Sequence, residues 1–315
     1  MPILIPLEKI TRYISGVISD AGEINKETGG ISSTTYSFKN KAGKVFYLRI
    51  PVLEIEKYEA EVYVHNLLQS QGVKVPRVVF FDKFSRELGR PAMIVAALAG
   101  EAVLNLNSEH QKQEILFKAG IDLAKINKNK INKFGWIKWD SGRDNLTGSF
   151  TTYEYFLLEN FDKSGPGNLA KKLKIIRDEG FINNDEAERI TQLIKQGLQL
   201  IQYSQAYLSH GDFAPQHVYH DNGVYTGIID FGDISGASEV YDLAHFRMTY
   251  EDDFHYLLAG YQTQTKLPRD LEVRLKYEGL IWLVRKIAWR IFDKINKRNN
   301  DKLALRLKKL KDYLN

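Results

Sequence analysis

Strand-like and helix-like repeats of hydrophobic residues alternate along the N-terminal part of this chain. Residues 53–71 repeat their apolar positions with a helical period, and Glu61 shares one stripe of that helix with Val64 and Leu68. A short helix is expected within residues 1–15. Several runs rich in β-branched and aromatic residues predict strands, with a polar turn after the first of them. These runs are 31–38, 45–50, 78–81 and 92–98.

Beyond residue 99 the helical period dominates. Residues 110–127 show it, and so does a long amphipathic segment that begins at Asn183, where Glu186 three positions later gives the character of a capping box. Residues 271–314 are also expected to be helical. The larger part of the chain is therefore predicted to be mainly helical.

The stretch from Tyr207 to Leu243 interrupts this helical pattern. It predicts a strand, a polar loop, a second strand, a tight turn and a third strand. Asn222-Gly223 forms the turn, because both residues tolerate the positive φ angles that a tight hairpin demands. Such a hairpin brings the loop that holds Asp212 near the loop that holds Asp230. Two acidic loops in contact predict a site for a divalent metal and a proton acceptor.

Together these segments predict an α+β fold with two lobes. Residues 1–98 would form a small antiparallel β lobe with one long helix, and residues 99–315 a larger, mainly helical lobe. A chain of 315 residues is long enough to give each lobe its own core.

Composition narrows the possible functions. The chain contains no cysteine, which excludes disulfides, zinc–thiolate sites and thiol catalysis. No run approaches the roughly 18 apolar residues of a membrane helix, and the first residues lack the features of a secretion signal. We therefore expect a cytoplasmic protein that binds no membrane and shows no obligatory protein partner.

The net charge of +5 comes largely from lysine and arginine after Arg285. Nucleic-acid binding is one interpretation of this basic balance. A solvated helix surface is the preferred one, because no helix-turn-helix, zinc-finger or RNA-recognition signature accompanies the charge. We expect no nucleic-acid partner.

Two acidic motifs carry a family resemblance. His210-Gly211-Asp212 is followed by Asp230-Phe231-Gly232 and then by Asp242-Leu243-Ala244. This order resembles the catalytic core of the aminoglycoside-phosphotransferase-like kinases, which are relatives of the protein kinases. In motif detail the chain is most similar to the macrolide phosphotransferases.

The resemblance implies a role for each residue of these loops. Asp212 would orient the acceptor hydroxyl and accept its proton, His210 would position the loop, and Asp230 would hold Mg²⁺ across the phosphates of ATP or GTP. His217 stands where the family usually has asparagine as a second metal ligand, although the macrolide branch also carries histidine. Imidazole suits Mg²⁺ less well than oxygen does, so His217 would ligate weakly, act through a water or leave the second metal site poor. The neighbouring Gln216 could offer an amide oxygen instead. Asn127 replaces a histidine of many relatives and is expected to weaken a contact that anchors the loop.

The first lobe would bind the nucleotide. By resemblance, Arg49 would grip the phosphates and pair with Glu61. A surface strand arginine is the alternative interpretation of Arg49. The other expected nucleotide contacts belong to a glycine-containing turn and to a hinge-like strand end, which could equally be an ordinary turn and a buried strand. These residues are Gly30, Ser32, Ser33, Ala96 and Leu98.

The acceptor is expected to be a hydroxyl of a small molecule: a macrolide, an aminoglycoside or a metabolic alcohol. The acidic run 250–253 could attract an amine-bearing substrate, although a solvated helix start is the simpler interpretation. Trp136 and Trp139 could line a pocket or pack in the core. The competing function is a catalytically weak, pseudokinase-like regulator that binds nucleotide, which His217 and Arg49 would support. A protein kinase fits poorly, because no Ala-Pro-Glu marker follows the second motif.

Overall fold

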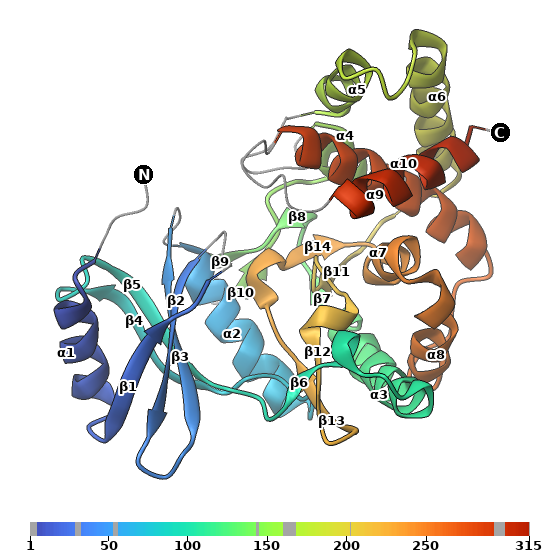
Figure 1. Ribbon diagram of the computed structural model, residues 1–315. Coiled ribbons are helices and arrows are strands. Elements are labelled where there is room, and N and C mark those ends of the chain that lie inside the picture. Colours follow the sequence, from blue (N-terminus) through green and yellow to red (C-terminus); the bar gives the residue numbers. More distant parts are fainter. Residues whose placement is uncertain are drawn as a thin grey trace.

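The computed structural model describes residues 5–28, 33–52, 56–142, 145–159, 168–201, 203–292 and 300–314. It has two lobes, and the predicted α+β fold is confirmed (Figure 1). The first lobe contains an antiparallel sheet with strand order β1-β2-β3-β5-β4. Its strands are β1 (Ala21–Lys26), β2 (Ser33–Asn40), β3 (Val45–Pro51), β4 (Val78–Ser85) and β5 (Arg90–Ala96).

Two helices cover opposite faces of this sheet, α1 (Leu7–Val17) and α2 (Glu56–Ser70). Successive side chains of a strand point to opposite faces. Leu48 of β3 therefore packs with Ile14 of α1 in one buried cluster, whereas the next residue, Arg49, points to the side of α2. The alternation along β3 places a cation beneath the long helix.

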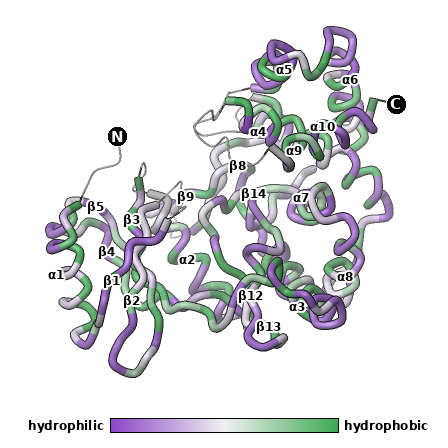
Figure 2. Tube along the Cα trace, in the orientation of Figure 1, coloured by the Kyte–Doolittle hydropathy of each residue, from purple (hydrophilic) through white to green (hydrophobic). Residues whose placement is uncertain are grey.

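Two local predictions for this lobe are confirmed, the turn after the first predicted strand and the buried stripe of the long helix, whereas β1 was not among the predicted strands. The turn between β2 and β3 closes through a hydrogen bond from the N–H of Gly43 to the carbonyl of Asn40 at 2.9 Å. Figure 2 shows this turn as a hydrophilic stretch at the edge of the molecule. The stripe predicted on α2 is buried, with Glu61, Val64 and Leu68 all 0% exposed.

The second lobe is mainly helical and contains small sheets of two to four strands. Its helices are α3 (Glu109–Asn127), α4 (Tyr153–Glu159), α5 (Leu169–Asp178), α6 (Asn184–Leu200), α7 (Tyr241–Thr249), α8 (Glu251–Gln262), α9 (Leu271–Phe292) and α10 (Asn300–Asp312). Its strands are β6 (Glu101–Ala102), β7 (Lys130–Ile131), β8 (Gly135–Trp136), β9 (Lys138–Asp140), β10 (Asn145–Thr147), β11 (Ala206–Ser209), β12 (Val218–Asp221), β13 (Val224–Ile228) and β14 (Ser235–Ala237). No helix within the described ranges is both long and apolar enough to cross a membrane.

Helices α3 and α8 pack closely because glycine lies at both contact points. A Cβ atom on Gly260 would lie 1.8 Å from the carbonyl oxygen of Phe117, and one on Gly120 would lie 2.1 Å from that of Leu257. The predicted capping box at the start of α6 is also present, since Asn183 and Glu186 exchange side chain–backbone hydrogen bonds of 2.8 and 2.9 Å.

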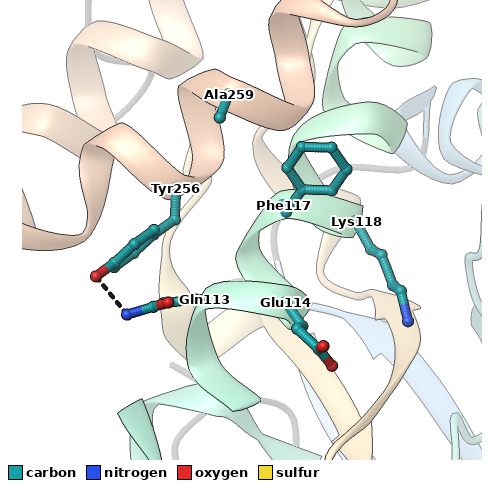
Figure 3. Close-up of a pocket in the computed structure, with 6 residues that line it drawn as sticks. All are labelled: Gln113, Glu114, Phe117, Lys118, Tyr256 and Ala259. Atoms are coloured by element: carbon teal, nitrogen blue, oxygen red, sulfur yellow. Dashed lines mark hydrogen bonds between the residues drawn. The ribbon is translucent and has the colours of Figure 1, made fainter. Parts of the chain in front are cut away.

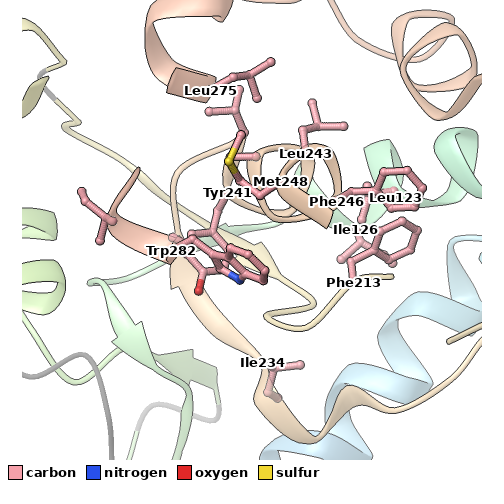
Figure 4. Packing of buried hydrophobic residues seen from close by; sticks show 14 of the residues in the cluster. Leu123, Ile126, Phe213, Ile234, Tyr241, Leu243, Phe246, Met248, Leu275 and Trp282 are labelled. Atoms are coloured by element: carbon pink, nitrogen blue, oxygen red, sulfur yellow. The ribbon is translucent and has the colours of Figure 1, made fainter. Parts of the chain in front are cut away.

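The core of the second lobe anchors the polar loops of the expected site. Phe213, which follows Asp212, is fully buried and its ring lies 5.9 Å from that of Phe246 in α7 (Figure 4). Phe231, which follows Asp230, is equally buried. Each acidic residue is thus followed in the chain by a phenylalanine that is buried in the core, and this fixes the position of its backbone.

Lys74 ties the two lobes together. Its backbone N–H donates to Asp122 of α3 at 3.1 Å, and its carbonyl accepts from Ile228 of β13 at 2.9 Å. Its ammonium group donates to the carbonyl of Tyr225 at 3.0 Å. The β12–β13 hairpin is therefore held against the first lobe, and this contact sets where the loops at its ends lie.

Candidate active site

The β12–β13 hairpin brings the two acidic loops together, as predicted. Its two-residue turn has positive φ angles of 49° at Asn222 and 79° at Gly223. His217 connects the loops: its Nδ1 donates to the carbonyl of Asp212 at 2.9 Å, and its Nε2 lies 3.6 Å from Oδ2 of Asp230. The two carboxylate-bearing loops therefore share one imidazole.

Asp242 organises the Asp212 loop from within the core. Its carboxylate is 0% exposed and accepts four hydrogen bonds of 2.9–3.0 Å, so both of its oxygens are occupied. The donors are the hydroxyl of Ser209, the backbone N–H groups of His210 and Gly211, and the amide of Asn127. One buried carboxylate thus fixes the backbone of the residues that precede Asp212.

The expectation that Asn127 weakens the anchoring of this loop is wrong. Its amide nitrogen donates to the carbonyl of Leu208 and to Asp242, both at 2.9 Å. Tyr261 donates to its amide oxygen at 3.3 Å. A carboxamide carries two N–H donors, so Asn127 can contact the strand and the carboxylate at the same time.

The backbone of Gly211 allows a close approach between the two loops. Its φ is +86°, and a Cβ atom at this position would lie 1.9 Å from the carbonyl oxygen of Asp233. Any larger residue would therefore push the Asp212 loop away from the Asp230 loop.

His210 joins the same loops through a neutral ring. Its Nε2 donates to the carbonyl of Ile229 at 2.8 Å, and its Nδ1 accepts from the N–H of Asp212 at 3.3 Å. Burial, and then the neighbouring His217, lower the pKa of His210. A neutral imidazole with one N–H and one lone pair satisfies both contacts.

Arg49 reaches this site from the first lobe. It forms the predicted ion pair with Glu61, and its NH2 lies 3.9 Å from Oδ1 of Asp230. Its guanidinium also lies 5.7 Å from the centre of the Tyr58 ring. Burial alone would lower the pKa of Arg49, but the Glu61 carboxylate outweighs it and the pKa is raised. The guanidinium therefore stays charged beside Asp230.

The Asp212 carboxylate has two partners that the sequence did not predict. Lys286 of α9 donates to its Oδ1 at 2.9 Å, and Nε2 of His245 in α7 lies 3.5 Å from the same oxygen. Burial would raise the pKa of Asp212, but these neighbours, Lys286 foremost, hold it well below its usual range. Burial lowers the pKa of His245 well below its usual value, so its ring is neutral near pH 7 and Lys286 supplies the charge. The only signal in the sequence was the basic segment after Arg285.

The residues of the Asp230 loop fit a metal that is shared with phosphates. Within the described residues, no group of three or more histidine, aspartate or glutamate side chains could hold a metal ion. Mg²⁺ is commonly bound by one or two carboxylates together with phosphate oxygens, which is fewer protein ligands than such a group. Asp230 has a left-handed backbone, φ 66°, and its side chain is 47% exposed. Because Nδ1 of His217 donates to the carbonyl of Asp212, its Nε2 faces the Asp230 carboxylate at 3.6 Å.

The predicted nucleotide-binding residues differ in whether the structure leaves them available to a ligand. Ser33 begins β2 opposite Pro51 and is buried, whereas Gly30 and Ser32 lie outside the described residues. The N–H of Ala96 donates to the carbonyl of Arg77 at 2.9 Å, so it is not free to bind a purine. Leu98 follows the end of β5, and its N–H has no acceptor in the described part of the chain.

Two hollows on the surface of the described residues lie away from the acidic loops. One, of about 410 Å³, lies between α3 and α8, where Gln113 donates to the hydroxyl of Tyr256 at 2.6 Å (Figure 3). The other, of about 820 Å³, lies between α2 and residues 129–134. The convergence of charged side chains, and not the size of a hollow, therefore locates the candidate site.

The aromatic residues around Trp136 belong to the core. Tyr153 and Phe156 are 3% and 1% exposed, and the rings of Trp136 and Phe156 lie 6.0 Å apart. Trp139 packs against Tyr63 of α2 at 4.7 Å between ring centres. Core packing, the simpler of the two interpretations, describes them.

A pH dependence of stability follows from His65 of α2. This side chain is 1% exposed, and its Nδ1 donates to the carbonyl of Pro76 at 2.8 Å. Burial lowers its pKa from 6.5 to about 4. Between these two pH values the unfolded chain binds more protons than the folded protein, so stability is full above pH 6.5 and decreases as the pH falls toward 4.

We expect the free energy of unfolding to decrease by up to about 1.4 kcal/mol per pH unit from this group alone. Urea unfolding of the wild type and of His65→Gln at pH 7, 6 and 5 measures it, and the variant should show the smaller slope. His110→Gln, which removes an exposed histidine of α3, should keep the wild-type slope. Equal slopes in all three proteins would contradict a neutral buried His65.

The sequence was compared with families of known function. A family model described as "Phosphotransferase enzyme family" matches residues 24–275, which is more than half of the 315 residues. No curated protein sequence matches the chain.

Several solved structures share the fold at low sequence identity. A thermostable mutant of aminoglycoside phosphotransferase APH(4)-Ia is 16% identical, with a TM-score of 0.67 over 96% of this chain and 97% of the other. The streptomycin–ATP complex of APH(2")-IIa is 16% identical, with a TM-score of 0.59 over 98% and 97%. A putative fructosamine-3-kinase from Thermobifida fusca YX-ER1 is 13% identical, with a TM-score of 0.62 over 96% and 98%.

Proposed function

The chain belongs to the phosphotransferase enzyme family and is a small-molecule kinase, and from this premise we propose that it transfers the γ-phosphoryl group of ATP or GTP to a small-molecule hydroxyl. One observation carries the proposal. The backbone carbonyl of Asp212 and the carboxylate of Asp230 both contact the imidazole of His217, and the guanidinium of Arg49 lies 3.9 Å from Asp230. Phosphoryl transfer requires this combination of a metal-binding carboxylate, a phosphate-binding cation and a carboxylate that faces the acceptor.

The first lobe, residues 1–98, is proposed to bind the nucleotide. Arg49 would contact the phosphates, with Glu61 holding its guanidinium in place. Ser33 and the backbone N–H of Leu98 would contact the phosphates and the base. Solved structures of this fold that bind ATP, ADP or AMP-PNP support a nucleotide donor.

Asp230, assisted by His217, would hold Mg²⁺, which when bound neutralises charge on the phosphates. Asp212 would accept a hydrogen bond from the acceptor hydroxyl and align its oxygen with the γ-phosphorus. Because its pKa is held low, Asp212 is a weak base that orients the hydroxyl and takes the proton late. In a loose transition state for phosphoryl transfer, a strong base is not required, because positioning of the reactants and neutralisation of charge account for most of the rate acceleration.

Release of nucleoside diphosphate from ATP and from GTP, with a panel of hydroxyl compounds, tests this function. We expect turnover with Mg²⁺ and none with EDTA. Asp230→Asn should lower the Mg²⁺-dependent rate by roughly 10²-fold or more, because it removes the charged metal ligand. Asp221→Asn, an exposed carboxylate on the same hairpin, should leave the rate unchanged.

A nucleotide-induced shift in melting temperature separates this enzyme from the pseudokinase-like regulator. The shift should be larger with Mg²⁺ than with EDTA. A melting-temperature shift that is equal with Mg²⁺ and with EDTA, together with the absence of nucleoside diphosphate release, would favour the regulator.

A further inference from the structure

Basic side chains from two C-terminal helices lie near the Asp212 carboxylate. The ammonium group of Lys286 in α9 lies 5.8 Å from the centre of the Trp282 ring, and the guanidinium of Arg306 in α10 lies 5.2 Å from it. The ring of His245 lies 4.7 Å from the same indole. Trp282 is almost fully buried beside α7 (Figure 4), so it provides a fixed base for both cations. We refer to Lys286, Arg306 and Trp282 as the basic cluster.

The basic cluster lies on the side of the site where the acceptor must bind. Arg49 approaches Asp230 from the first lobe, whereas Lys286 approaches Asp212 from α9 with a hydrogen bond of 2.9 Å. In the proposed reaction Asp230 faces the nucleotide and Asp212 faces the acceptor.

Among the described residues, Lys286 and Arg306 carry two positive charges and face one carboxylate, that of Asp212. Asp212 is the carboxylate bound to Lys286, and no described residue forms an ion pair with Arg306. Burial, and then the neighbouring Arg290, lower the pKa of Arg306, while Asp212 raises it. The indole N–H of Trp282 also lacks an acceptor among the described residues.

Nearby carboxylates on α8 already have cation partners. Asp253 pairs with Lys112 at 2.8 Å, and Glu251 pairs with Lys309 at 2.9 Å. Two of the three carboxylates in the acidic run 250–253 are therefore already paired, and the third, Asp252, is exposed in the first turn of α8. A polycationic acceptor would meet, near Asp212, a guanidinium that has no ion-pair partner among the described residues.

We propose that the acceptor of this enzyme carries an anionic group, a carboxylate or a phosphate, that binds to Arg306 and Lys286 beside Asp212. This inference rests on the proposed phosphotransferase function. A guanidinium can contact two oxygens of either group with parallel hydrogen bonds. An anion that draws Lys286 from Asp212 would leave the carboxylate free to accept the acceptor hydroxyl. Binding of the anion and orientation of the hydroxyl would then be coupled.

Binding of minimal anions tests the site before any acceptor is known. The full-length protein is saturated with Mg²⁺ and AMP-PNP, so that phosphate-binding groups of the nucleotide site are occupied. Inorganic phosphate and acetate are then titrated at constant ionic strength, and the melting temperature is followed. At least one anion should raise the melting temperature of the wild type, and which of the two acts decides between a phosphate and a carboxylate.

Arg306→Gln should weaken the binding of that anion by roughly tenfold or more, because the substitution removes a charge-assisted hydrogen bond. Arg306→Lys should restore part of the effect. Lys308→Gln removes the same charge from an exposed position of α10 and should behave as the wild type. No anion effect in the wild type, or an equal effect in Arg306→Gln, would overturn the proposal.

Turnover provides the second arm. Two anionic acceptors, glycerol 3-phosphate and glycerate, are compared with glycerol and with an aminoglycoside. Arg306→Gln should raise the KM for the two anionic acceptors and leave the KM for the nucleotide unchanged. A KM for the anionic acceptors that stays at the wild-type value in Arg306→Gln would contradict the proposal. If AMP-PNP fails to bind in the presence of Mg²⁺, the proposed function fails instead, so the two failures are distinguishable.

Discussion

Replacement of Asp212 with asparagine is expected to lower kcat by about 10³-fold or more while Mg²⁺–nucleotide binding persists. The amide cannot carry the negative charge that orients and finally accepts the hydroxyl proton. Asp230 lies on the other loop and Arg49 lies on β3 of the first lobe, so both should keep their geometry. Nucleoside diphosphate release gives kcat, and a melting shift with AMP-PNP gives nucleotide binding.

Asp252→Asn is the matched control for this experiment. It removes an exposed carboxylate from the first turn of α8, in the same lobe, and should leave kcat unchanged. If Asp212→Asn retains wild-type turnover, Asp212 does not act on the acceptor and another base must be sought.

Replacement of Asp242 with asparagine is expected to reduce both stability and turnover, although Asp242 contacts no reacting atom. Its carboxylate accepts four hydrogen bonds, and an amide nitrogen in place of one oxygen would face N–H and O–H donors. Each donor left unpaired in the core costs about 1–3 kcal/mol. We expect a loss of about 3–5 kcal/mol in the free energy of unfolding. Urea unfolding measures this loss.

Turnover in Asp242→Asn tells whether Asp242 positions the catalytic loop. In protein that remains folded, kcat should fall by roughly 10²-fold with little change in the KM of the nucleotide, because the loop backbone loses its anchor. Asp185→Asn, an exposed carboxylate at the start of α6, should change neither quantity. A loss of stability with wild-type kcat in the folded fraction would show that Asp242 supports the fold alone.

Several elements of the site were predictable because their determinants lie close together in the sequence. Asn222 and Gly223 allow the positive φ angles of a two-residue turn, so the hairpin and the meeting of its two loops follow from a few adjacent residues. The pair between Arg49 and Glu61 was implied by the family resemblance, and the helical stripe of α2 indicated that Glu61 is buried and needs a partner.

Other parts depended on contacts that no local pattern contains. The sequence shows that Asn127 ends a helix, but its two donors meet a strand and a carboxylate from elsewhere in the chain. Ala96 shows the reverse case. Its position at the end of a predicted strand suggested that its backbone N–H would be free to bind a ligand. In the structure this N–H donates to the carbonyl of Arg77.

By itself, the sequence determined the two-lobed α+β fold, the order of the acidic motifs and the hairpin that joins them, because hydrophobic periodicity and turn chemistry act over a few residues. Only the tertiary structure decided what surrounds Asp212. Lys286 lies 74 residues away along the chain, and Arg306 comes from a further helix. A helical pattern shows which side of α9 is buried but not which side chain it meets, so the charge around the acceptor site emerges only when the helices pack together.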